Sequence, residues 1–203
     1  MRTPDAARIV CKYFIWILAA CFATGQTYYS VQEVRVPGLP NLVAKSKDPS
    51  DILLTSLDII FHDPHICCGK DSALEDSALR ADSSSLQDIA AKLQGRHLLN
   101  DGRPIMVTAD YWSASAINSG ALIAALRNKN ALLMEWNSRI YVCYGVTFRQ
   151  DYDNETGMEL DTIQKFLLID TRYSGAQRET VFNRETDDWS KVQGMLYLKS
   201  AMQ

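Results

Sequence analysis

The spacing of hydrophobic residues along the chain changes near residue 130. Before it, apolar residues mostly recur at helical spacing, and after it they form short runs rich in β-branched and aromatic residues, which predict strands. We expect helices at 52–61, 69–81, 84–95 and 113–127, a short strand at 104–109, and further strands at 131–136, 139–148, 163–170, 179–183 and 192–198. Helices that precede an antiparallel sheet of about five strands indicate the α+β fold class.

Local signals mark several element boundaries. Pro64 has to end the first helix, and Ser84-Ser85-Leu86-Gln87 has the spacing of a capping box, with Gly95 at the end of that helix. Asn137-Ser138 predicts a turn between two strands. Two helices are expected to bury one face each, formed by Leu86, Ile89, Ala90 and Leu93 in the first and by Ile117, Ala121, Ala124 and Ala125 in the second.

The N-terminus has the pattern of an export signal. Basic residues precede an apolar run at 13–23, which is too short to span a bilayer and has the length of a signal-peptide core. Within 1–24, Leu18-Ala19-Ala20-Cys21 resembles a bacterial lipobox, in which Cys21 would carry the lipid; the alternative is an ordinary signal peptide. We expect a tether at 25–49, a single domain at 50–203, and a location in the bacterial cell envelope, periplasmic or lipid-anchored, or secretion.

Composition narrows the range of partners. With 47% hydrophobic residues in 203, the chain can bury one sizeable core. It carries 21 basic and 24 acidic residues, a net charge of −3, and no basic run, so we expect no nucleic-acid partner. Contact with a membrane is expected only through the lipid anchor.

Of the five cysteines, Cys67, Cys68 and Cys143 lie outside the signal region. Three is an odd number, so in an oxidising compartment at least one of these thiols is free or pairs between chains.

Cys68 is the candidate with the clearest chemistry. It lies where a loop stiffened by Pro64 meets the start of the helix expected at 69–81. Backbone N–H groups and the helix dipole at such a place favour the thiolate, which is the nucleophile in cysteine catalysis. The alternative is a small buried residue at a helix start.

The pattern around this cysteine resembles papain-like cysteine peptidases, most closely the bacteriocin-processing branch that cleaves double-glycine leaders. Cys68-Gly69 opens a helix as in that family, 130–134 with 139–146 is similar to its strand pair, and 167–170 is similar to the strand that ends in its aspartate. The resemblance covers roughly 50–198. It implies a papain-like fold with N-terminal helices that carry the cysteine, with Cys68 as nucleophile and Asp170 as the orienting carboxylate.

Two positions depart from the family pattern. Arg139 stands where the family has its catalytic histidine, and arginine cannot accept a proton near neutral pH. His62 stands at the oxyanion position in place of the family's glutamine. We therefore expect a degenerate peptidase, with weak thiol-dependent peptide hydrolysis at most. Its substrate subsites would include the aromatic residues Trp112, Trp136 and Tyr141, which could equally belong to the core.

Other interpretations of the same residues stay open. A papain-like scaffold without its histidine predicts a non-catalytic module of the cell envelope that binds a peptide or protein. Alternatively, the cluster of His62, His65, Cys67 and Cys68 has ligand types suited to zinc or copper; the peptidase interpretation implies no metal and no cofactor. Three smaller alternatives concern single residues: an Arg139–Asp170 ion pair, a Cys67–Cys143 disulfide or a buried Cys143, and a His97 that is either solvated or caps the end of a helix.

Overall fold

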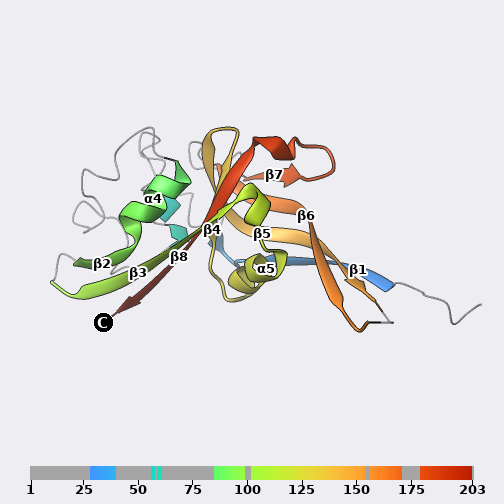
Figure 1. Cartoon of the computed structure of the whole chain (residues 1–203), viewed down its shortest axis with the longest axis horizontal. Coiled ribbons are helices and arrows are strands. Elements are labelled where there is room, and N and C mark those ends of the chain that lie inside the picture. The colour runs from blue at the N-terminus through green and yellow to red at the C-terminus, as the bar shows by residue number, and fades with distance from the viewer. Residues whose placement is uncertain are drawn as a thin grey trace, which may run out of the picture.

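The computed structural model describes residues 28–39, 56–57, 59–60, 85–98, 102–153, 156–170 and 179–202. In this part of the chain, eight strands form one antiparallel sheet in the order β2-β3-β8-β4-β5-β6-β7, with β1 paired to β5 beside that row (Figure 1). The strands are β1 Tyr28–Arg35, β2 Gly95–Leu98, β3 Pro104–Ser113, β4 Leu132–Trp136, β5 Arg139–Tyr152, β6 Glu159–Asp170, β7 Glu179–Asn183 and β8 Val192–Met202. The helices are α4 Leu86–Leu93 and α5 Ser119–Arg127, with 3-10 turns η1 Ala114–Ala116 and η3 Trp189–Lys191.

The predicted α+β, papain-like arrangement is wrong. The described residues form an open antiparallel sheet of eight strands in place of N-terminal helices followed by about five strands. Strand β1 arises from the segment expected to be a tether, β2 follows directly on α4, and β3 extends to Ser113. These early strands join the later ones by pairing over long sequence distances, β1 with β5 and β3 with β8, which no local pattern reveals.

Local predictions around α4 and the β4–β5 turn are confirmed. Ser85 caps α4 in a capping box with Asp88, one residue later than the sequence suggested, and Leu86, Ile89, Ala90 and Leu93 are buried. The turn at Asn137 and Ser138 has positive φ at both residues, as expected for a two-residue hairpin turn between β4 and β5. Helical residues at 56–57 and 59–60 agree with the first predicted helix.

Helix α5 begins later than expected and buries a different face. Asn118 is its N-cap and accepts a hydrogen bond from the backbone N–H of Ala121 at 2.9 Å, so residues before Asn118 are outside the helix. The face predicted from Ile117, Ala121 and Ala124 is therefore wrong. The residues that α5 buries are Leu122, Ile123, Ala125 and Leu126, of which only Ala125 was expected.

The core lies between the sheet and its helices. α4 packs against β3, β8 and β4, whereas α5 packs against β1, β5 and β6. A cluster of rings on the sheet adds to this core, with centroid separations of 4.9–5.9 Å, the spacing of favourable aromatic pairs. Its members are Trp136, Tyr141, Phe166, Phe182 and Trp189.

Strand β5 has two different partners along one of its edges. Over Arg139–Cys143 it pairs with β4, and from residue 145 to 152 it pairs with β1, while β6 occupies the other edge throughout. The change of partner falls at Tyr144, whose carbonyl accepts a hydrogen bond from the N–H of Val36 at 2.7 Å, and at Gly145. A Cβ at Gly145 would lie 2.8 Å from the carbonyl oxygen of Val34, so this approach of β1 requires glycine.

Several sequence predictions fall outside the described residues. These are the signal peptide at 1–24 with Cys21, the helix at 69–81, and the whole loop that contains His62, His65, Cys67 and Cys68. Where the chain is described, no helix is long and apolar enough to cross a membrane.

Candidate functional site

Two members of the predicted catalytic set, Arg139 and Asp170, lie among the described residues, on adjacent strands. Asp170 ends β6 opposite Tyr141 and is 6% exposed; Arg139 is exposed, begins β5 opposite Trp136 and lies two residues before Tyr141. Among the described residues, the ion pairs of arginines join Arg35 to Glu33 and Arg149 to Asp151, and none joins Arg139 to Asp170. The predicted nucleophile Cys68 and the oxyanion candidate His62 lie outside the described part.

The aromatic residues predicted as substrate subsites have packing roles. Trp136 lies between Tyr141 and Phe182, with ring centroids 5.5 and 4.9 Å away, and Tyr141 is buried. Trp112 is half-buried and contacts Tyr197 at 6.1 Å. These contacts account for the three side chains as parts of the core and its margin.

Cys143 is a free, fully buried thiol. Its Sγ donates a hydrogen bond to the carbonyl of Gly145 at 3.6 Å, and burial raises its pKa from 9.0 to about 12. The thiolate that a nucleophile or a metal ligand requires is therefore strongly disfavoured here. The prediction that Cys143 fills the core is confirmed.

The described side chains do not form a metal centre. They contain no cluster of three or more His, Cys, Asp or Glu that could hold an ion, and the predicted ligands His62, His65, Cys67 and Cys68 are not among them. His97 donates from Nε2 to the carbonyl of Leu93 at 2.8 Å, so of the two roles that the sequence left open it caps the end of α4.

The outer edge of β1 is the feature that the sequence did not suggest as a site. Among the described strands, β1 pairs only with β5. The N–H of Val36 bonds the carbonyl of Tyr144, so Val36 points its backbone groups toward β5. In an antiparallel pair every second residue does the same, and residues 30, 32 and 34 therefore also point their N–H and C=O groups toward β5. The backbone N–H and C=O groups of Tyr29, Val31, Glu33 and Arg35 consequently point away from the sheet.

The side chains of these four residues share one exposed face of β1. Tyr29 is 68% exposed and Val31 57%, while Val34 on the opposite face packs against the core. Leu160 of β6 is 65% exposed and lies in the same row as Tyr29, because both are register partners of Asp151. The guanidinium of Arg149 lies 5.6 Å from the centre of the Tyr29 ring.

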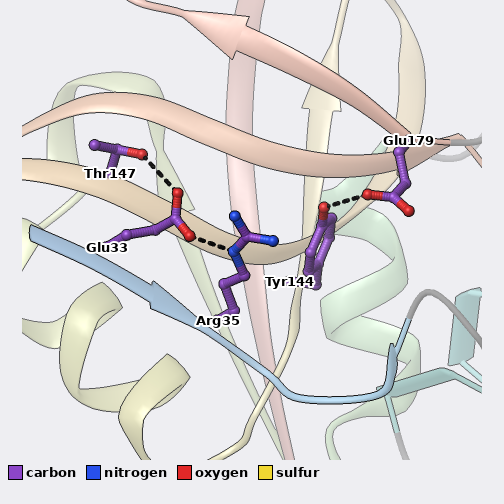
Figure 2. A network of polar contacts seen from close by, with 5 residues as sticks. All are labelled: Glu33, Arg35, Tyr144, Thr147 and Glu179. Carbon is purple, nitrogen blue, oxygen red and sulfur yellow. Dashed lines mark hydrogen bonds and ion pairs between the residues drawn. The ribbon is translucent and has the colours of Figure 1, made fainter.

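A network of polar contacts holds the inner end of β1 against its neighbours (Figure 2). Glu33 accepts hydrogen bonds from Arg35 and, at 3.4 Å, from Thr147 of β5, and the bond to Glu33 raises the pKa of Arg35. The Arg35 guanidinium lies between Glu33 and the Tyr144 ring, whose hydroxyl points to Glu179 of β7 (Figure 2).

The link from β5 to β7 depends on a buried phenol. Tyr144 is 4% exposed and donates its hydroxyl hydrogen to Glu179 at 2.8 Å. Burial, then the hydrogen bond to Glu179 and the negative charge of that residue, raise the pKa of Tyr144 from 10.0 to about 12. The phenol therefore keeps its proton over the whole physiological range.

One sequence signal for the β1 edge was available. Tyr28-Tyr29-Ser30-Val31-Gln32 has the aromatic and β-branched content of a strand with polar alternation. Pro37, Gly38 and Pro40 follow closely and favour a linker when the segment is considered as a whole.

Comparison with known proteins gives no family model, no curated relative and no solved structure that matches the chain. The function is therefore inferred from the geometry of the described residues.

Proposed function

We propose that this protein is a non-catalytic module that binds an extended peptide or protein segment along the outer edge of β1. The observation that carries the proposal is the edge itself. Every second residue from Tyr29 to Arg35 points its backbone N–H and C=O groups away from the sheet and has an exposed side chain. The opposite side of the strand is paired with β5 along all eight residues. An extended segment can add to such an edge as a further strand, with its main chain making the hydrogen bonds.

The described residues favour a binding role over the predicted thiol-dependent hydrolysis. The described thiol is buried with a raised pKa, and no ion pair among the described residues joins Arg139 to Asp170. By contrast, β1 is paired with β5 along all eight residues, so its outer edge is held in a strand conformation before a partner arrives. Such pre-organisation lowers the entropic cost of association.

Selection from a displayed library of random short peptides tests the proposal. The full chain is the bait, and Val31→Pro is the counter-bait, because proline removes an N–H that points outward and leaves the inward ladder to β5 in place. Val31→Thr is the matched control, since it keeps the N–H and the side-chain shape. We expect peptides that bind the wild type and the threonine variant and lose most of their binding to the proline variant.

Amide hydrogen exchange on the wild type tests the same point without a substitution, in case the proline variant does not fold. A bound peptide should slow exchange at Tyr29, Val31, Glu33 and Arg35. Failure to select any peptide, or selected peptides that bind without protecting these amides, would overturn the proposal.

A further inference from the structure

The three strands β1, β5 and β6 continue together beyond the helices as an arm, which we define as residues 28–32, 149–153 and 156–162. Figure 1 shows β1 running along the β5–β6 hairpin toward the tip of this arm. The two faces of the arm differ in chemistry. A bound segment that adds to β1 as a further strand would place alternate side chains on one face and on the other.

One face of the arm is apolar at the β1 edge. Tyr29 and Val31 are exposed there, and Leu160 extends the same row two strands away. The charged residues of this face neutralise each other, because Arg149 bonds Asp151 at 2.9 Å. Every second side chain of a partner strand beside β1 would contact Tyr29 and Val31 and should be apolar.

The other face of the arm is polar and acidic. Gln32 donates to the side-chain oxygen of Gln150 at 2.9 Å, and the amide nitrogen of Gln150 lies 3.3 Å from carboxylate oxygens of both Glu159 and Asp161. This chain of contacts leads from the β1 edge to two carboxylates on β6, that of Glu159, which is exposed, and that of Asp161, which is half-buried. The arm as a whole has four acidic residues, Asp151, Asp153, Glu159 and Asp161, against one basic residue, Arg149, a net charge of 1 − 4 = −3.

From this juxtaposition we infer that the partner is an extended segment of another protein in which apolar residues alternate with lysine or arginine. Its apolar side chains lie over Tyr29 and Val31. Its basic side chains lie on the same face as Glu159 and Asp161, and the negative charge of that face attracts them across β1 and β5. The inference rests on the proposed function, because it takes the β1 edge as the binding element. Charge complementarity of this kind sets specificity and the rate of association.

Three synthetic peptides of equal length test the inference against the full chain. One alternates valine with lysine, one valine with glutamate, and one serine with lysine. We expect the valine–lysine peptide to bind about tenfold more tightly than the valine–glutamate peptide, since several exposed charge pairs contribute. The difference should shrink between about 0.05 M and about 0.5 M salt, because screening shortens the range of the interaction. The serine–lysine peptide should bind weakly, since it lacks the apolar face.

Two variants locate the charge effect. The double substitution Glu159→Gln with Asp161→Asn keeps amide groups beside Gln150 and should remove most of the preference for lysine. Glu185→Gln, which removes an exposed carboxylate in the turn between β7 and β8, is the control and should leave the preference unchanged.

The outcomes separate this inference from the proposed function. Equal binding of the valine–lysine and valine–glutamate peptides, with the β1 amides protected by both, would overturn the basic partner and leave the binding edge standing. A peptide-free chain that dimerises with concentration and protects the same amides would make a second copy the occupant and overturn the inference. If these peptides and the displayed library both fail to protect β1, the binding edge itself is wrong.

Discussion

Replacement of Gly145 by alanine should loosen β1 specifically, because Gly145 is where β5 exchanges β4 for β1. The added Cβ would lie 2.8 Å from the Val34 carbonyl oxygen, 2.9 Å from Leu167 Cδ1 and 3.2 Å from Arg35 Cγ. The two side-chain atoms can move aside, but the Val34 oxygen belongs to the backbone of β1. The strand itself must shift to make room.

The magnitude follows from two opposing effects. Overpacking in a closely packed site costs about 1–3 kcal/mol. Alanine also restricts the unfolded chain, which returns about 0.4–1 kcal/mol where the backbone conformation suits it. We therefore expect Gly145→Ala to lower the free energy of unfolding by about 1–2 kcal/mol, measured by urea denaturation with an unchanged denaturant slope.

Gly120→Ala is the matched control. A Cβ there has one neighbour within 4 Å, Asn118 Oδ1 at 3.4 Å, which is an ordinary contact, and the residue lies in α5. We expect this variant to gain up to about 1 kcal/mol. Hydrogen exchange should become faster in β1 of Gly145→Ala while β4 and β8 keep their protection. A Gly145→Ala protein as stable as the wild type, with β1 exchange unchanged, would refute the packing argument.

Three further substitutions or treatments have defined outcomes. Ser85→Ala should lower the free energy of unfolding by about 1 kcal/mol through loss of the α4 cap. The control Gln87→Ala, on the exposed side of α4, should change it by less than about 0.5 kcal/mol. Equal effects of the two variants in thermal melts would contradict the capping role of Ser85. The raised pKa of Tyr144 means that the folded state holds the phenol proton more tightly than the unfolded state, so this contribution to stability is complete below pH 10.0 and is lost as pH rises toward about 12. Tyr144→Phe removes the bond to Glu179, so it should lower the free energy of unfolding by about 1 kcal/mol at neutral pH. Its free energy of unfolding should also fall less steeply than that of the wild type as the pH rises above 10. An equally steep fall would contradict the raised pKa of Tyr144. Cys143 should resist iodoacetamide in the folded protein at about pH 8 and react after denaturation, as read by peptide mass spectrometry, and modification of the native protein would show that the thiol is accessible.

Elements with short-range causes could be predicted from the sequence. The α4 face, the turn at Asn137 and Ser138 and the strand Glu179–Asn183 depend on residues close together in the chain, and the structure has them as expected. Strand ends were less accurate, because pairing with a neighbour extends a strand beyond its own apolar run. Arg149–Tyr152 is polar in sequence and is a strand because β1 and β6 pair with it on both sides.

The candidate site could not be predicted in the same way. Glu33 and Arg35 have an ordinary charge pattern, and they meet Thr147 and Tyr144 only because β1 returns to β5 over more than a hundred positions. The resemblance to papain-like peptidases depended on order and spacing along the chain, which does not specify strand neighbours. The order β3-β8-β4 inserts the last strand between two earlier ones, and this insertion separates the fold from the expected one.

The pairing of β1 with β5 has a consequence for synthesis of the chain. Gln32 and Gln150, which bond across this pair, are 118 residues apart, so β1 leaves the ribosome long before its partner is made. Closing so large a loop is slow, and contacts of this kind form late in folding. We therefore expect β1 to stay unpaired, with its aromatic and β-branched residues exposed to chaperones, until β5 has been translated.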